Sequence, residues 1–296
     1  MPPRPAVVLI VAFWAATLGV AFYRDVWPHL SASGPPPIAV DLSDEASQLV
    51  PVRWAVLRGD RPVGKLTTRM VYVDADDTFC FLHHYSQVEF DFSGARVLIP
   101  DLTTTTRVTR AGHLREQTMT GKLVLQWRRG AEYVPLAEVA AKAEGRVENG
   151  VFVGRSEIAS PLLNVSRAFD PVPVPGGQVL NPLQPLNRVA GVRPGQRWVV
   201  HEIDPLREAV ATLFREEAGK HGFGLPDAPR EAAIAEVRSS PEVLTWGKAR
   251  AEASCWVIDY RTGEARARTW VRVSDGRVLR QEAFGLGERV ALEREE

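Results

Sequence analysis

Apolar and polar side chains alternate along most of the chain beyond its first fifty residues, which is typical of β-strands with one buried face. The alternating runs, for example residues 52–73 and 253–284, are rich in β-branched and aromatic residues. Turn signals such as Gly59-Asp60 and Asn149-Gly150 separate them, because glycine and asparagine accept the positive φ of tight hairpins. The pattern predicts a mainly β fold of the α+β class, with a curved antiparallel sheet or half-barrels.

One segment has the period of an amphipathic helix, and we predict a packing helix over residues 205–218. Asp204 is a suitable N-cap, and Pro205 suits the first turn. Apolar residues recur on one face at helical spacing: Leu206, Val210, Leu213 and Phe214. The charged residues of this segment have both signs and its apolar stripe is narrow. We therefore expect the helix to lie on a sheet rather than on a membrane.

Proline and glycine crowd residues 171–195, which excludes regular structure there. The segment is either a long loop across a sheet or a connection between two β-rich subdomains, at residues 50–170 and 196–296. Three consecutive prolines within residues 31–49 predict an extended, semi-rigid linker. The preceding residues, 1–30, are interpreted as a membrane anchor or signal segment.

The N-terminal segment contains a long apolar run, since Ala6–Tyr23 holds 18 residues without a charge. A helix of that length is about 27 Å long, close to the roughly 30 Å hydrocarbon core of a bilayer. Arg4 precedes it, and positive charge stays on the cytoplasmic side, so a single transmembrane helix would place the rest of the chain outside the cytoplasm. The alternatives are a signal peptide, with secretion after cleavage, and a buried core helix.

Composition narrows the possible partners. Lysine plus arginine equals aspartate plus glutamate, at 36 each, so the formal net charge is zero. A nucleic-acid-binding protein usually shows a basic excess, so we predict no nucleic-acid partner. Hydrophobic residues make up 45% of the chain and charged residues 24%, which suits a folded protein with a sizeable core.

The chain has two cysteines, Cys80 and Cys255, and both lie in apolar strand-like runs. Outside the cytoplasm they could form a disulfide, although buried free thiols fit such runs equally well. A cysteine hydrolase would need a thiolate activated by a nearby base. Neither cysteine opens a helix, where the dipole would lower the pKa of a thiol, so a hydrolase is the weakest of the functions considered.

The stretch FCFLHHYSQVEF, residues 79–90, places two histidines side by side. On a strand, neighbouring side chains point to opposite faces, so His83 and His84 cannot bind one metal ion. Cys80 shares a face with His84 but lies about 13 Å along the strand, too far for a common zinc. We predict an ordinary strand and no metal site, with these residues on one face: Phe79, Phe81, His83, Tyr85, Gln87 and Glu89.

The stretch GDRPVGKL, residues 59–66, spells most of a phosphate-binding loop. Leu66 replaces the required serine or threonine, and a strand-like run follows where the motif needs a helix N-terminus. We therefore predict a hairpin turn at this point and no cofactor.

Tryptophans recur in the strand-like runs beyond the linker. Core packing explains them, but curved antiparallel sheets also enclose apolar cavities, and tryptophan suits the lining of such a cavity. The residues considered for this lining are Trp54, Trp127, Trp198, Trp256 and Trp270.

The order of strands and turns, from WAVLRGDRPVG near the start to WVRVSDGRVLRQE near the end, resembles β-rich bacterial envelope proteins of unknown function. These are similar in pattern to periplasmic lipoprotein carriers, whose folds are curved sheets covered by helices. The resemblance implies a non-enzymatic extracytoplasmic module that binds a lipid or another apolar ligand. The alternative is a structural or assembly subunit that contacts another envelope protein.

Overall fold

The computed structural model describes residues 13–14, 17–20, 50–92, 95–109, 113–161, 164–174, 187–189, 191–200, 204–206, 233–247, 249–262, 265–285 and 288–295. Within these ranges the chain forms sixteen strands and one 3-10 turn: β1 (Val52–Arg58), β2 (Arg61–Val73), η2 (Asp74–Asp76), β3 (Thr78–Phe92), β4 (Ala95–Thr109), β5 (Leu114–Arg129), β6 (Glu132–Glu148), β7 (Val151–Ala159), β8 (Asn164–Ala168), β9 (Val172–Pro173), β10 (Arg197–Val200), β11 (Ala233–Val237), β12 (Glu242–Trp246), β13 (Ala251–Thr262), β14 (Ala265–Arg272), β15 (Val278–Gly285) and β16 (Glu288–Arg294).

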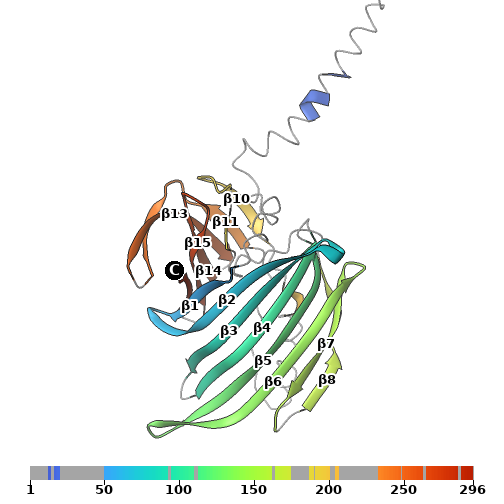
Figure 1. Cartoon of the computed structure of the whole chain (residues 1–296), viewed down its shortest axis with the longest axis vertical. Helices are drawn as coiled ribbons and strands as arrows, with labels where there is room; N and C mark the ends of the chain where they lie inside the picture. Colours follow the sequence, from blue (N-terminus) through green and yellow to red (C-terminus); the bar gives the residue numbers. More distant parts are fainter. Residues whose placement is uncertain are drawn as a thin grey trace, which may run out of the picture.

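These strands belong to one antiparallel sheet. Its order is β10-β11-β13-β14-β15-β16-β1-β2-β3-β4-β5-β6-β7-β8, with β12 beside β13 and β9 beside β7. Figure 1 shows β2 to β7 as long, tilted strands in a curved sheet, with β10 to β15 gathered at its other end. The mainly β fold and the curved antiparallel sheet are confirmed.

Strand β1 joins the two ends of the chain. It pairs with β2 on one side and with β16 on the other, so Trp54 lies opposite both Leu66 and Arg294. The strands of residues 50–170 and 196–296 therefore form a single hydrogen-bonded sheet. Between them, the described part of the connection contributes β9 and a bridge from Arg188 to Arg277.

The main core lies on the inner face of this sheet, the face that carries Trp54, Leu66 and Val88. Because the sheet curls, that face of β1 to β3 packs against the inner face of β11 to β15. The buried members of the cluster are Trp54, Val56, Leu66, Val88, Val189, Val200, Ala235, Val237, Ile258, Tyr260, Ala267, Val271 and Val278. Apolar burial of this extent is the main favourable term in folding.

Strands β13 to β15 are also buried on their outer face. Leu244 and Trp246 on β12 cover Cys255, Val257 and Trp270, which lie in a second buried cluster. Burial on both faces removes the need for polar side chains at alternate positions. This explains why four consecutive apolar residues, Cys255–Ile258, occur within the otherwise alternating run.

A pair of glycines makes room for a third cluster. Gly145 on β6 and Gly154 on β7 lie directly opposite each other. The rings of Phe152 and Phe169 stack above them, with centroids 5.6 Å apart and planes 8° from parallel. The absence of two Cβ atoms lets both rings approach the backbone.

The predicted turns match the structure where it is described. Gly59-Asp60 joins β1 to β2, so the GDRPVGKL stretch is a hairpin, as predicted. Asn149 and Gly150 have φ of 53° and 79° between β6 and β7. Such angles are the ones that a tight hairpin turn requires.

Strand β3 differs from the prediction at one point. Gln87 has a φ of 53° and is left out of the pairing with β4. A residue in the left-handed region interrupts the regular alternation of side chains between the two faces of a strand. The prediction that Gln87 and Glu89 face the same way as Phe79 is therefore wrong, and Val88 and Phe90 take the inner face instead.

Two predicted helices lie mostly outside the described residues. Of the helix predicted at 205–218, Pro205 and Leu206 are described and helical; the rest is outside. Of the run Ala6–Tyr23, residues 13–14 and 17–20 are described, and they are helical. Where the chain is described, none of its helices combines the length and the apolar character that a membrane span requires.

We expect Gly154→Ala to destabilise the fold. A Cβ at this position would lie 2.6 Å from Cζ of Phe169 and closer still to the carbonyl oxygen of Glu144. Overpacking of this kind costs about 1–3 kcal/mol, which would lower the urea midpoint of unfolding. Gly19→Ala is the control, because a Cβ there would meet no atom within 4 Å and the position does not have a positive φ. Equal midpoints for the two variants would contradict the assigned role of Gly154.

Candidate functional site

A cavity of about 250 Å³ lies where the inner face of β3 and β4 meets that of β15 and β16. Its wall is largely apolar: Val56, Tyr85, Val88, Phe90, Ile99, Leu102, Ala283, Val290 and Leu292, with Arg268, Gln281 and Glu282 as the polar members. Ligand pockets combine such apolar walls with a few polar groups, and this cavity is slightly smaller than the roughly 300–1,000 Å³ usual for them.

The irregularity in β3 creates the apolar wall. Val88 and Phe90 face the cavity only because Gln87 is unpaired. Opposite Gln87, Pro100 on β4 is also left out of the pairing, and proline has no N–H to donate to a ladder. Without this interruption, charged Glu89 would face the cavity in place of the two apolar side chains.

The polar groups at the cavity are held by neighbours rather than presented as free charges. Burial, with a smaller contribution from Asp204, raises the pKa of Tyr85 to about 12, so its hydroxyl stays protonated. Gln281 donates to the hydroxyl of Thr269 at 3.3 Å. Arg268 donates to a carboxylate oxygen of Asp259 at 3.1 Å. The cavity therefore offers hydrogen-bonding groups and little uncompensated charge.

Glu282 is only 5% exposed, and its carboxylate is neutralised by arginines. One oxygen lies 2.8 Å from Arg280 and 3.6 Å from Arg289. Arg280 also contacts Glu293 at 3.0 Å. Burying a carboxylate costs less free energy where such partners compensate its charge. This network stiffens the β15–β16 wall of the cavity.

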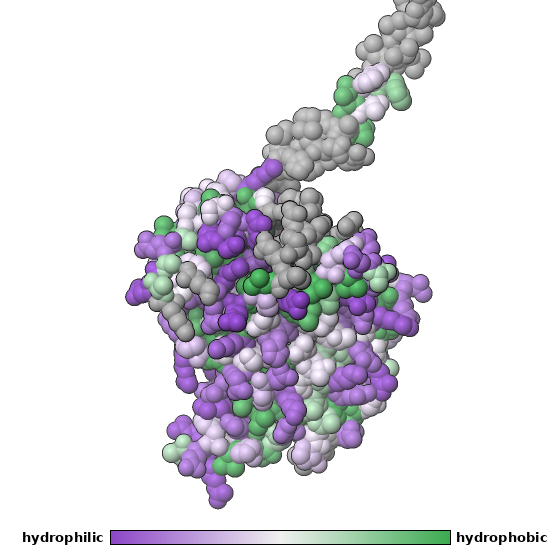
Figure 2. Space-filling view, in the orientation of Figure 1, coloured by the Kyte–Doolittle hydropathy of each residue, from purple (hydrophilic) through white to green (hydrophobic). Residues whose placement is uncertain are grey.

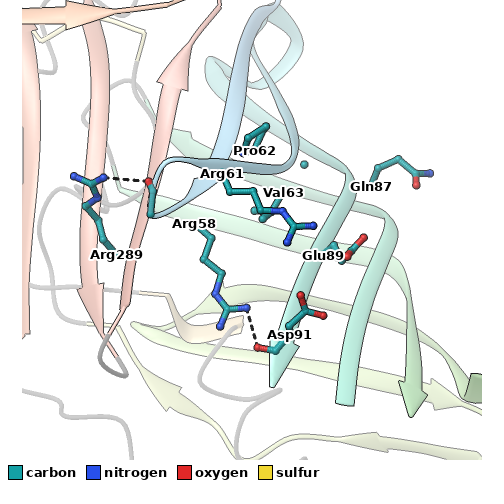
Figure 3. A pocket seen from close by; sticks show the side chains of 10 residues that line it. Arg58, Arg61, Pro62, Val63, Gln87, Glu89, Asp91 and Arg289 are labelled. Atoms are coloured by element: carbon teal, nitrogen blue, oxygen red, sulfur yellow. Dashed lines mark hydrogen bonds between the residues drawn. The ribbon is translucent and has the colours of Figure 1, made fainter. Parts of the chain in front are cut away.

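A second, larger cavity of about 730 Å³ lies between the β1–β2 hairpin and β3, with Arg289 of β16 also at its wall (Figure 3). The pairing of β2 with β3 ends at Lys65 and Ser86, although Gly64 still lies against the backbone of Val88. Arg58 reaches across the cavity and donates to the carbonyl oxygen of Asp91 at 2.8 Å. Arg289 donates to the carbonyl oxygen of Gly59 at 3.2 Å.

Most charges in this cleft are already paired. Arg96 contacts Glu89 at 3.0 Å and Asp91 at 2.9 Å, and its hydrogen bond lowers the pKa of Asp91. Arg289 also pairs with Asp60. Because these ion pairs compensate one another, the charged cleft is a weaker candidate for a ligand site than the apolar cavity.

The structure does not gather the five predicted tryptophans around a cavity. Trp54 is fully buried and donates to the hydroxyl of Thr68 at 3.0 Å. Trp198 and Trp256 pack against the same core cluster. Trp270 lies in the outer-face cluster, and Trp127 is 55% exposed at the end of β5. The described lining of the apolar cavity includes none of them.

The residues that do line the cavity were missed because their role depends on contacts between distant strands. Leu102 and Val290 belong to unremarkable alternating runs, and nothing local distinguishes them. Two consecutive polar residues, Ser86 and Gln87, separate Tyr85 from Val88. This local pattern does not by itself distinguish an interrupted strand from a regularly alternating one.

The two cysteines lie on different strands, Cys80 on β3 and Cys255 on β13, and both are free thiols. Burial raises the pKa of Cys80, and it raises the pKa of Cys255 to about 11. A nucleophilic cysteine needs a lowered pKa, so neither environment provides the activation that a hydrolase requires.

The adjacent histidines lie on opposite faces of β3. His84 is exposed and lies 3.2 Å from a carboxylate oxygen of Asp101. His83 is buried on the inner face, and its Nδ1 has no hydrogen-bond partner among the described residues. Burial lowers the pKa of His83 to about 4, so its ring is neutral at physiological pH.

Comparisons with known proteins add one structural likeness. No protein-family model matches the chain, and no curated protein matches it. Among solved structures it is similar to a β-barrel-like protein of a domain of unknown function, DUF1849, from Brucella abortus, with 12% identity and a TM-score of 0.35. The match covers 83% of this chain and 96% of the other. It does not show the similarity to lipoprotein carriers that the sequence pattern implied.

Stability should fall as the pH drops from about 6.5 to about 4, in part because of His83. The unfolded chain takes up a proton at the ordinary histidine pKa of 6.5, whereas the folded chain resists it until about 4. The contribution of His83 to the free energy of unfolding is therefore fully present above pH 6.5. At 1.36 kcal/mol per pKa unit, its protonation at low pH lowers the free energy of unfolding by about 3 kcal/mol.

Urea unfolding between pH 4 and pH 7 measures this effect. His83→Phe should flatten the pH dependence, because it removes the titrating ring and its unpartnered nitrogen. His84→Gln, at the exposed neighbouring position, should leave the slope unchanged. A slope that depends on His84 instead would show that the buried ring is not the cause.

Proposed function

We propose that this protein is a non-enzymatic binding module that takes the apolar chain of a lipid or a related molecule into the cavity between β3–β4 and β15–β16. The observation that supports this most directly is the wall itself, in which nine apolar or aromatic side chains face a common space of about 250 Å³. Binding of an apolar ligand to this wall is favourable, because it removes apolar surface from water.

The size of the cavity limits the ligand. At about 30 Å³ for a water-sized group, 250 Å³ holds roughly eight such groups. A methylene group is comparable in size, so the cavity suits a short acyl chain or the terminal part of a longer one. Gln281 and Tyr85 supply hydrogen-bonding groups at the wall, which suits a chain that ends in a polar group.

The same proposal places the β-rich part outside the cytoplasmic membrane, held there by Ala6–Tyr23 as a single-pass anchor. Its support is the length of the uncharged run and the position of Arg4 before it. Secretion after signal cleavage would leave the binding role unchanged.

Ala283→Phe should weaken binding of decanoic acid by at least tenfold, because the ring fills space that Ala283 leaves open beside Val290. Isothermal titration calorimetry measures the affinity, and a negative heat-capacity change would mark burial of apolar surface. Ala140→Phe is the matched control, since Ala140 is exposed on β6.

Native mass spectrometry of the purified chain gives an independent check. We expect additional mass that matches a lipid or fatty acid, and less of it in Ala283→Phe. A chain that carries no such mass and does not bind decanoic acid would refute the proposed function.

A further inference from the structure

The hairpin of β5 and β6 extends beyond its neighbours and has an apolar tip. The pairing of β4 with β5 ends at Ala95 and Trp127, and β7 pairs with β6 only from Ala140 onward. Residues 128–133 thus have no neighbouring strand outside the hairpin among the described residues. Figure 1 shows this hairpin projecting at the lower left of the molecule.

Three large apolar side chains are exposed near this tip: Trp127 at 55%, Val134 at 43% and Leu136 at 62%. Trp127 and Val134 lie directly opposite each other across the hairpin, so they share a face. In Figure 2 apolar side chains gather at the lower end of the molecule beside hydrophilic ones. Scattered apolar residues need no explanation, but a cluster on a projecting hairpin indicates an interaction surface.

The charge beside the cluster is basic. Arg128 and Arg129 are exposed, and neither forms an ion pair with a carboxylate in the part of the chain that the structure describes. Arg128 donates only to the carbonyl oxygen of Gly130, at 3.2 Å. Glu132 lies opposite Arg129 in the pairing and compensates one of the two positive charges, so residues 127–134 carry a formal net charge of +1.

Tyr133 lies opposite Arg128 in the pairing, so it occupies the other face of the hairpin tip from Trp127 and Val134. The guanidinium of Arg96 lies 3.9 Å from the centroid of the Tyr133 ring, and Arg96 is itself fixed by Glu89 and Asp91. Tryptophan and tyrosine are enriched where membrane meets water, because each combines an apolar ring with a polar group. Arginines next to them suit anionic headgroups.

We propose that the β5–β6 tip docks on an anionic membrane surface, with Trp127, Val134 and Leu136 in the interface and Arg128 and Arg129 on the lipid phosphates. Anionic headgroups complement the net positive charge of the tip, and the interfacial region of a bilayer accommodates its exposed Trp127 and Val134, which is why we favour a membrane over a protein partner. The surface goes beyond the proposed ligand cavity and would exist even if that cavity bound nothing.

The position of the tip links it to the cavity. Phe90, which lines the cavity, pairs with Val97 on β4, and Val97 pairs with Leu125 on β5. Leu125 precedes Trp127 by two residues, so all four lie on the inner face. An apolar track thus runs across the strands from the cavity to the docking tip.

The experiment places an environment-sensitive nitrobenzoxadiazole dye at the tip of the full chain, through Ala131→Cys. Vesicles of phosphatidylcholine with about one third phosphatidylglycerol should shift the dye emission to the blue, and salt should weaken the shift. Val243→Cys is the matched control, because Val243 is also exposed, at 70%, but lies on β12. The unsubstituted chain gives the background from Cys80 and Cys255.

Arg128→Glu with Arg129→Glu should raise the lipid concentration for half-maximal shift by at least tenfold, and so should Trp127→Ala. Arg115→Glu, at the other end of β5, should have no effect. A blue shift at Val243→Cys equal to that at the tip would overturn the proposal, because it would report insertion through the N-terminal segment alone. A shift without vesicles that grows with protein concentration would assign the tip to a second copy of the chain instead.

The two proposals fail separately. Loss of decanoic acid binding with an intact dye shift would refute the cavity alone. An absent dye shift with intact decanoic acid binding would refute the docking tip alone.

Discussion

The pairing of β1 with β16 holds the two ends of the β-rich chain together, and the rest of the structure depends on it. The ladder is continued beyond the strands by hydrogen bonds from the N–H of Gly59 to the carbonyl of Arg289 at 2.7 Å, and from the N–H of Glu295 to the carbonyl of Arg53 at 2.8 Å. Bringing β1 and β16 together closes a loop that contains nearly all of the β-rich chain. This closure costs conformational entropy, although the cost grows only slowly with the length of the loop. The main core, shared between β1–β3 and β11–β15, offsets that cost.

Both cavities adjoin one local irregularity. Because Gln87 is unpaired, β3 turns Val88 and Phe90 inward and Glu89 outward. The ladder with β2 also ends at Ser86, beside Gln87, and the charged cleft is lined from this point by Gln87, Glu89 and Asp91. The register with β4 is the same on both sides of Gln87 and Pro100, so the interruption affects both strands equally. Beyond it, β3 has the apolar cavity on one face and the charged cleft on the other.

The inner face is not uniformly apolar, and its polar residues are mostly partnered. Thr68 accepts from Trp54, and Gln117 accepts from the backbone N–H of Leu206 at 3.2 Å. The hydrogen bond between Leu206 and Gln117 holds the residues that follow Asp204 against the inner face. Buried polar groups with partners specify one arrangement of strands, since any slip would leave them unsatisfied. Only His83 and Ser156 among the described inner-face residues of β3 and β7 retain an atom without a partner.

The sequence by itself determined the class of the fold, its antiparallel hairpins and its turns, because alternation and positive-φ residues act over a few neighbouring positions. It also determined that His83 and His84 face opposite ways. Only the tertiary structure decided that one sheet unites both β-rich segments, that the five tryptophans disperse and that Val56, Tyr85 and Leu292 share a cavity. These features depend on pairing between strands that lie far apart in the chain, and on one unpaired residue whose effect on the facing of β3 cannot be read from alternation alone.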